Sequence, residues 1–208
     1  MFASKIRGMG MGNKGLVARL LTAVIDYWFS RQGWTVEGRA VEPRKFVIIA
    51  APHTSNWDFV YFVGASKRLN LHLSFMGKKS LFRWPFGKMM REMGGIPVDR
   101  SKSGNYVDAM IAEFAKRSEF MLTIAPEGTR GKVRQWRTGF YHIAVGAGVP
   151  LVCGLMDYKR KVVGLGPAIW PTGDYAKDME QVTAYYSQCT PKFPERGNPG
   201  VITESKNA

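Results

Sequence analysis

Lys45-Phe46-Val47-Ile48-Ile49-Ala50-Ala51 runs without a break into Pro52-His53-Thr54-Ser55-Asn56-Trp57-Asp58. The first run is apolar and rich in β-branched residues, which predicts a buried strand. A helical pattern over residues 57–67 follows. His53 is therefore expected at a strand-to-helix turn, with Asp58 in the first turn of the helix. In open α/β sheets, ligands bind at such turns.

The His53–Asp58 pair admits a catalytic and a structural interpretation. A carboxylate can hold one ring nitrogen of a histidine, which leaves the other nitrogen free to take a proton from a substrate. An Asp near the start of a helix is equally an ordinary cap or a partner of the helix dipole. His72 and His142 have no Asp five residues later. Because the pair alone does not decide, the rest of the chain has to.

Composition favours a globular chain with an anionic partner. The 208 residues are 45% apolar, which is typical of one domain with a real core. The net charge of +14 predicts nucleic acid, an anionic membrane, or an acidic protein or phosphorylated substrate as the partner. Cys153 and Cys189 offer neither a disulfide framework nor a metal-ligand spacing, so no metal site is predicted, and reduced thiols suit the cytosol. No apolar run approaches the roughly 20 residues that span a bilayer.

Strand and helix patterns alternate along the chain. This alternation predicts a single layered α/β domain with a largely parallel central sheet flanked by helices. The predicted strands are 34–37, 45–51, 71–76, 94–100, 119–125, 149–155 and 161–165. The predicted helices are 14–32, 57–67, 104–116, 138–146 and 174–188, with a mixed, interrupted pattern over 78–92.

The N-terminal helix, residues 14–32, carries its apolar side chains on one stripe. The stripe can pack on the domain. Alternatively, the helix can lie in a membrane surface, with Trp28 and Phe29 at the headgroup level and basic residues on anionic lipids. The expected division of the chain is a flexible leader and amphipathic helix over 1–33, a main domain over 34–190 and a flexible tail over 191–208.

Polar residues lie at the ends of three of the predicted strands. They are His53 with Asp58, Asp99 with Arg100, and the run Glu127-Gly128-Thr129-Arg130. The carboxyl ends of parallel strands lie on one edge of a sheet, so these residues can converge. Gly128 would allow a sharp backbone turn. Arg100 and Arg130 suit a bidentate grip on a phosphate, although a lone Arg is usually a solvated surface charge.

Four sequence blocks occur in a characteristic order over roughly residues 46–155. They are His53-xxxx-Asp58; Lys78-xx-Leu81-xxx-Pro85 with Gly94-Gly95-Ile96-Pro97-Val98-Asp99-Arg100; Pro126-Glu127-Gly128-Thr129-Arg130; and Val149-Pro150-Leu151-Val152. This set resembles the signature of the glycerolipid acyltransferases, which include the 1-acylglycerol-3-phosphate acyltransferases. The first block is weak evidence alone, whereas the ordered set is strong evidence.

The resemblance implies transfer of a fatty acyl group from a thioester, acyl-CoA or acyl carrier protein, to the free hydroxyl of a lysophospholipid such as 1-acylglycerol-3-phosphate. It implies that His53 is the general base and that Asp58 orients the imidazole, with no acyl-enzyme. The remaining motif residues would position the acceptor and hold its phosphate. They are Glu127 and Gly128 with Thr129 for position, Arg100 and Arg130 for the phosphate, and Lys78 for the same or a neighbouring acidic group.

The resemblance also implies the partners. No cofactor would be bound, because the thioester is a co-substrate. An anionic membrane surface is expected, and nucleic acid is not, since no nucleic-acid-binding module is visible. Without a predicted transmembrane anchor, the chain is expected to be peripheral on the cytoplasmic face of a membrane.

Three departures from the family pattern leave the acceptor open. Gly131 stands where many members have Ser, Pro52 precedes the histidine in place of Asn or Gly, and Ala125 precedes the Pro-Glu in place of Phe or Val. Another lysolipid acceptor, a CoA-independent transacylase and a non-catalytic lipid-binding protein are the alternatives. Substitution of His53 by Ala separates an enzyme from a binder, because only the enzyme would lose turnover while keeping its lipid binding.

Overall fold

The computed structural model describes residues 15–39, 41–98 and 105–198. Its helices are α1 (Leu16–Ser30), α2 (Asn56–Ser66), α3 (Gly87–Glu92), α4 (Asn105–Lys116), α5 (Gly139–Ala147) and α6 (Tyr175–Tyr186). Its strands are β1 (Thr35–Glu37), β2 (Lys45–Ile49), β3 (Leu73–Lys78), β4 (Gly95–Val98), β5 (Phe120–Ile124), β6 (Leu151–Asp157) and β7 (Val162–Ile169). The described residues also form the 3-10 helices η1 (Lys79–Phe82) and η2 (Pro194–Arg196).

The strands that the described residues form make one sheet in the order β1-β7-β6-β2-β5-β3-β4. Neighbouring strands are parallel throughout, except for β6 and β7, which are antiparallel. β2 lies in the middle, with Val47 opposite Leu122 of β5 on one side and Leu151 of β6 on the other. The predicted α/β domain with a largely parallel sheet is confirmed.

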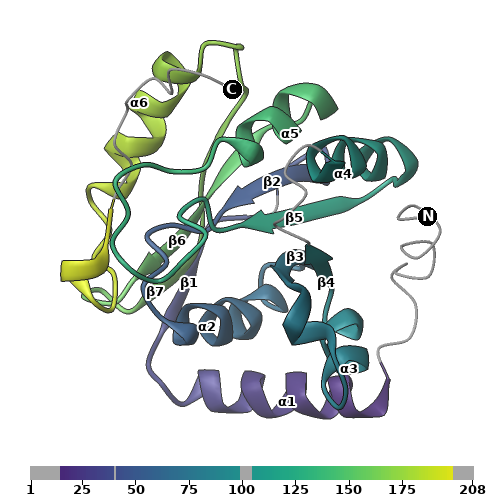
Figure 1. Ribbon diagram of the computed structural model, residues 1–208. Helices are drawn as coiled ribbons and strands as arrows, with labels where there is room; N and C mark the ends of the chain where they lie inside the picture. The colour runs from purple at the N-terminus through teal and green to yellow at the C-terminus, as the bar shows by residue number, and fades with distance from the viewer. Residues whose placement is uncertain (1–14, 40, 99–104, 199–208) are drawn as a thin grey trace.

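Helices cover both faces of the sheet, with α4, α5 and α6 on one side and α1, α2 and α3 on the other (Figure 1). Successive side chains of β2 alternate between the two layers, as the pleat of a strand requires. Val47 and Ile49 pack in the core beneath α4, α5 and α6. Phe46 and Ile48 pack in the core beneath α1 and α2. Because β2 is buried on both faces, it appears in the sequence as a continuous apolar run.

One edge of α1 packs on the domain. Phe29 is 1% exposed and lies against Gly64 of α2, where a Cβ would come within 2.8 Å of the Phe29 side chain. Trp28 stacks on Trp57 and touches Tyr61. Phe29 is thus buried in the domain and not placed at the headgroup level of a membrane, whereas Trp28 is only partly buried, against Trp57 and Tyr61. The opposite edge of the helix is exposed, at Leu16, Val17, Leu20, Val24 and Tyr27.

The described residues of the C-terminal segment, 191–198, fold back onto the domain. The backbone N–H of Phe193 donates to Thr54 Oγ1 at 3.3 Å, and the side chain of Asn198 donates to the carbonyl of Val133 at 2.7 Å. This differs from the flexible tail that composition predicts, because tertiary hydrogen bonds hold a segment in which the sequence shows no regular pattern. Residues 199–208 and the leader, 1–14, lie outside the described residues. In the described part of the chain, no helix is long and apolar enough to cross a membrane.

Candidate active site

The turn between β2 and α2 is held by a capping box. Ser55 is the N-cap of α2, and its hydroxyl accepts from the backbone N–H of Trp57 at 3.2 Å. The Asp58 carboxylate reaches back and accepts from the backbone N–H groups of Thr54 and Ser55, each at 3.0 Å. The structural interpretation of Asp58 is therefore correct as far as it goes, since this side chain satisfies donors that a helix start leaves free.

The same carboxylate holds the histidine. Asp58 Oδ2 lies 3.0 Å from His53 Nδ1. Because this oxygen already accepts two backbone N–H groups, Nδ1 must be the donor, and the lone pair of the neutral imidazole is on Nε2. The His53 side chain is 24% exposed and that of Asp58 is 10% exposed, so the ring reaches solvent more than its partner does. Asp58 therefore both caps α2 and holds the ring of His53.

Tyr158 completes the partners of Asp58. Its hydroxyl donates to Asp58 Oδ1 at 2.7 Å, from just beyond the end of β6. Burial and the bond to Asp58 raise the pKa of Tyr158, so the hydroxyl stays protonated as a donor. The edge-on rings of Trp34 and Tyr61, at 5.0 and 5.7 Å between centroids, hold it in place. Tyr158 could not be predicted from the sequence, because it lies 100 residues from Asp58 and belongs to no local motif.

Glu127 binds the backbone of the His53 turn. Both of its carboxylate oxygens accept from the backbone N–H of His53, at 2.8 and 3.1 Å. Burial raises the pKa of Glu127 to about 7, although the His53 N–H acts in the opposite direction. The carboxylate is 5% exposed. The structure thus gives Glu127 a contact with His53 that the sequence did not predict, while its contact with an acceptor stays a prediction.

The rest of the Glu127-to-Arg130 run turns outward beside α2. Gly128 has φ +66°, a conformation that favours glycine, as the predicted sharp turn requires. Thr129 is exposed, and its hydroxyl faces the N–H of Gly131 at 3.4 Å. Arg130 is exposed and donates to the side-chain oxygen of Asn56, the first residue of α2. The guanidinium therefore lies at the N-terminus of α2, next to the His53 turn.

The two other predicted basic residues differ in what can be said of them. Lys78 is the last residue of β3 and is exposed. Since β3 pairs in parallel with β5 and β5 with β2, Lys78 lies at the edge of the sheet where the His53 turn begins. Arg100 lies outside the described residues. A cation from the C-terminal segment was not predicted: Lys192 Nζ lies 5.2 Å from the ring of Trp57 and 6.0 Å from that of Tyr158.

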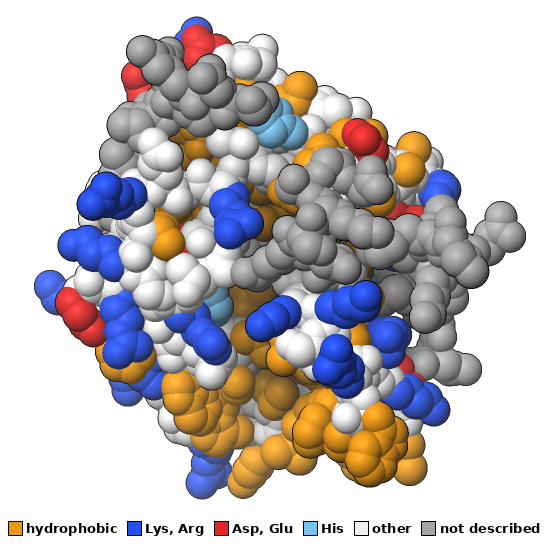
Figure 2. All heavy atoms as spheres, viewed as in Figure 1, with side chains coloured by type: hydrophobic (Ala, Val, Ile, Leu, Met, Phe, Trp, Pro, Cys, Tyr) orange, Lys and Arg blue, Asp and Glu red, His pale blue; other side chains and the backbone are white. Residues whose placement is uncertain are grey.

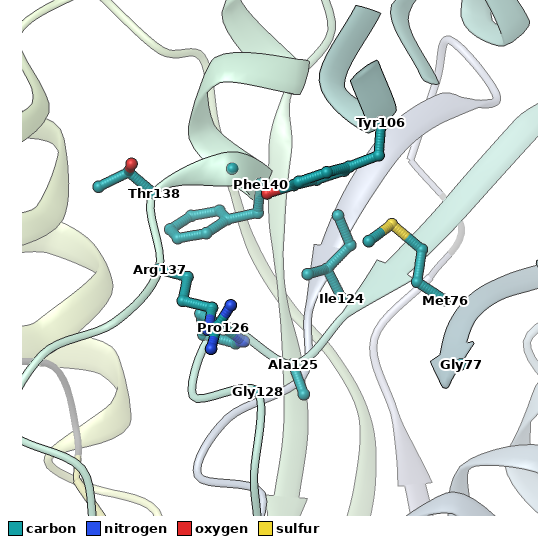
Figure 3. Close-up of a pocket in the computed structure, with 11 residues that line it drawn as sticks. Met76, Gly77, Tyr106, Ile124, Ala125, Pro126, Gly128, Arg137, Thr138 and Phe140 are labelled. Atoms are coloured by element: carbon teal, nitrogen blue, oxygen red, sulfur yellow. The ribbon is translucent and has the colours of Figure 1, made fainter. Parts of the chain in front are cut away.

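A cavity of about 300 Å³ opens beside the Gly128 turn, between the ends of β3 and β5 and the starts of α4 and α5. Figure 3 shows Arg137 beside Pro126 and Gly128, with the rings of Phe140 and Tyr106 above them in the view. Its lining is Met76, Gly77, Tyr106, Ile124, Ala125, Pro126, Gly128, Arg137, Thr138, Gly139 and Phe140. The cavity is thus mainly apolar, with one guanidinium close to the backbone that follows Glu127.

Among the described residues, no three His, Cys, Asp or Glu side chains gather closely enough to hold a metal ion. What the site does offer is a proton acceptor on His53, a fixed carboxylate on Asp58 and exposed cations around them. This set is suited to removing a proton from a neutral hydroxyl beside an anionic group.

Comparison with known proteins shows the family of the chain. A family model described as Acyltransferase matches residues 33–156. The 1-acyl-sn-glycerol-3-phosphate acyltransferase of Haemophilus influenzae is 31% identical over 162 residues, which is 72% of this chain and 63% of that protein. The protein of the same name from Escherichia coli strain K12 is 33% identical over 112 residues, which is 50% of this chain and 44% of that protein.

A solved structure shares the fold. The 1-acyl-sn-glycerophosphate (LPA) acyltransferase PlsC from Thermotoga maritima aligns with a TM-score of 0.55 and 20% identity, over 85% of this chain and 80% of that one. The β2–α2 turn and its histidine lie inside the region that the family model matches, which is more than half of the chain. The chain belongs to the acyltransferase family. It spans 63% and 44% of the lengths of the Haemophilus and Escherichia relatives.

Proposed function

We propose that this protein transfers a fatty acyl group from an acyl thioester to the free hydroxyl of a lysophospholipid such as 1-acylglycerol-3-phosphate. The observation that carries the proposal is the imidazole of His53, held at Nδ1 by Asp58 at 3.0 Å and still partly exposed. Membership of the acyltransferase family supports the reaction class. The names of the two bacterial relatives support the acceptor.

In the proposed reaction, His53 Nε2 takes the proton of the acceptor hydroxyl as its oxygen attacks the thioester carbonyl. The tetrahedral intermediate collapses, the carbon–sulfur bond breaks, and the departing sulfur receives the proton from the imidazolium. The products are an ester and a free thiol, with no covalent enzyme intermediate. Asp58 stabilises the imidazolium and fixes the ring, as the acid does in serine hydrolases. Holding both substrates together supplies much of the rate.

The cations at this edge are proposed to bind the phosphate of the acceptor. Arg130 can exchange its bond to Asn56 for a charge-assisted bond to a phosphate oxygen. A phosphate bound there would also lie at the N-terminus of α2, where the positive end of the helix dipole favours an anion. Lys78 lies at the same edge of the sheet, and Arg100 remains part of the proposal by its motif alone. Glu127 would act by holding the backbone of His53.

The apolar cavity beside Gly128 is proposed to take part of an acyl chain. Phe140, Ile124 and Met76 give it an apolar lining, and it borders the Glu127 turn. Acyl-CoA and acyl carrier protein are both anionic, so the net charge of +14 suits either donor. No bound cofactor is needed for this chemistry.

The site of action is proposed to be an anionic membrane surface, with the protein peripheral on the cytoplasmic side. The exposed apolar edge of α1 and the basic surface support the membrane contact. The free thiols of Cys153 and Cys189 support a reducing compartment.

The test is acceptor-dependent release of thiol. Acyl-CoA and acyl carrier protein donors of several chain lengths are offered with lysophosphatidic acid and other lysolipids to the wild-type protein and to the Lys78→Ala and Arg130→Ala variants. Release only with phosphate-bearing acceptors, with a raised KM in Arg130→Ala, supports the proposal. Release with a different lysolipid corrects the acceptor. No acceptor-dependent release with any pair contradicts thioester chemistry and favours transacylation or lipid binding.

A further inference from the structure

The segment between β3 and α3 exposes large apolar side chains. Trp84 is 94% exposed, and Leu81 and Phe86 are 51% and 62% exposed. Single exposed apolar residues are ordinary, whereas several within one short segment make that segment a candidate for an interaction site. We call Leu81, Trp84 and Phe86 the aromatic tip.

The aromatic tip stands on a firmly packed base. Phe82, inside the same segment, is 6% exposed and fills the space above Gly77 and Gly95, where a Cβ would come within about 3 Å of its ring. The guanidinium of Arg91 lies 5.6 Å from the same ring. The N–H of Gly87 donates to the carbonyl of Arg83 at 2.8 Å, which closes the segment at the start of α3. The tip therefore projects apolar groups from a supported segment.

The aromatic tip leads into α3, and α3 packs beside the start of α1. The start of α1 touches the end of α3, since a Cβ on Gly15 would come within 2.7 Å of the Glu92 carboxylate. Figure 2 shows apolar side chains gathered along the lower rim of the molecule, where Figure 1 places α1 and α3. The exposed edge of α1 consists of Leu16, Val17, Leu20, Val24 and Tyr27. Two separate chain segments thus contribute to one apolar rim.

The charge within the segment that carries the tip has one sign, and the nearest carboxylate along the chain is Glu92 at the end of α3, 3.9 Å from Lys88 Nζ. Residues 78–91 contain Lys and Arg but neither Asp nor Glu. All five of these cations are exposed: Lys78, Lys79, Arg83, Lys88 and Arg91. Figure 2 shows Lys and Arg just above the apolar rim. An apolar rim with cations behind it matches the layering of an anionic bilayer, whose charged headgroups lie outside its hydrocarbon.

We propose that the aromatic tip is a second membrane contact, which inserts Trp84 and Phe86 into the headgroup region of an anionic bilayer beside α1. This inference rests on the membrane part of the proposed function. Two contacts fix the tilt of a protein on a surface, whereas one helix leaves it free to roll. The tip follows the end of β3 directly, at the sheet edge where β2 leads into the His53 turn. Insertion of the tip therefore places this edge near the lipid, within reach of an acceptor that stays in the bilayer.

Vesicle binding tests the inference. The wild-type protein, the double variant Trp84→Ala with Phe86→Ala, and the control Trp170→Ala are sedimented with vesicles of phosphatidylcholine and phosphatidylglycerol. Trp170 is also an exposed indole, 57% exposed, but it lies beyond β7 and outside the rim. We expect the partition coefficient of the double variant to fall about tenfold or more, because two aromatic side chains lose their burial in lipid. The control should bind as the wild type does.

Fluorescence supplies a second readout. Brominated lipids quench an indole that enters the bilayer, so the wild-type protein should lose more emission on binding than Trp84→Phe does. Equal vesicle binding by the double variant and the wild type overturns the inference. So does a concentration-dependent dimer that protects Trp84 without lipid. If the double variant Leu20→Ala with Val24→Ala binds more weakly and the tip variant does not, α1 is a membrane contact and the aromatic tip is not. If the wild-type protein does not bind vesicles, both membrane contacts are overturned. Thiol release with a dispersed short-chain acceptor then still tests the acyl transfer.

Discussion

At the scale of single residues, Asp58 connects the fold and the proposed chemistry. It accepts hydrogen bonds from the backbone of Thr54 and Ser55, from the ring of His53 and from the hydroxyl of Tyr158. The two backbone donors fix the turn. The two side-chain donors connect the carboxylate to the proposed base and to the distant end of β6. A change at Asp58 would therefore affect stability and turnover together, so its partners are better probes.

Tyr158→Phe removes one donor to Asp58 and keeps the ring. We expect kcat to fall severalfold with little change in KM. The acidic limb of the pH–rate profile should move to higher pH, because a carboxylate with one fewer hydrogen bond attracts the imidazolium proton more strongly. The free energy of unfolding should fall by about 1 kcal/mol. Tyr61→Phe is the matched control, since Tyr61 belongs to the same aromatic cluster. An unchanged pH profile in Tyr158→Phe would leave the tyrosine a purely structural residue.

Glu127→Gln tests the buried acid beneath His53. Burial raises the pKa of Glu127 from 4.5 to about 7, so the native state holds this proton more tightly than the unfolded state does. Its contribution to stability is then fully present below pH 4.5 and is lost as the pH rises to about 7. The loss can reach about 3 kcal/mol. Gln does not titrate and can still accept from the His53 N–H.

Denaturant unfolding of both proteins across this pH range measures the effect. Relative to the wild type, the stability of Glu127→Gln should rise as the pH increases through the window. Parallel stability curves for the two proteins would contradict the raised pKa.

At the scale of elements, the helices and strands that could be predicted are those that neighbouring residues determine. The apolar run 45–51 and the capping residues around Ser55 and Asp58 lie within one stretch, so the strand, the turn and the helix could all be predicted from it. Tyr158 and segment 191–198 reach the site through tertiary contacts only. No periodicity or motif marks such contacts in a single sequence.

The α1–α2 contact depends on a glycine. Gly64 lets Phe29 approach the backbone of α2, and a Cβ there would lie 2.8 Å from the Phe29 side chain. We expect Gly64→Val to destabilise the protein by about 2 kcal/mol through overpacking, measured by denaturant unfolding. In combination with Phe29→Ala, which opens space at the same place, the cost should be less than the sum of the two single substitutions. Additive costs would show that the two residues do not share this contact.

At the scale of the whole molecule, the order of the strands could not be predicted from the sequence. The prediction that polar strand ends converge needed only a parallel sheet, and the structure brings His53, Asp58 and Glu127 together. The buried face of α1 could not be predicted, because the apolar stripe of the helix is wider than the surface of the domain on which it packs. Phe29 packs on that surface, whereas Leu20 and Val24 are exposed.

The charge of the molecule leads to a salt prediction. With a net charge of +14, binding to anionic vesicles should weaken steeply between about 0.1 M and 1 M ionic strength, as the screening length shortens from about 10 to about 3 Å. The apolar contacts of α1 and the aromatic tip should leave a residual, salt-resistant component. Sedimentation with anionic and with neutral vesicles separates the two. Binding that is equal on both kinds of vesicle and insensitive to salt would contradict an electrostatic contribution.

Thiol release by His53→Ala tests the central claim most directly. Wild type and variant are compared with one acyl thioester and one lysophospholipid, after both are shown to have the same melting temperature and the same vesicle binding. If His53 is the general base, acceptor-dependent release falls at least about a hundredfold in the variant while lipid binding persists. A variant that releases thiol at the wild-type rate would contradict the proposed chemistry and leave the His53–Asp58 pair as a helix cap alone.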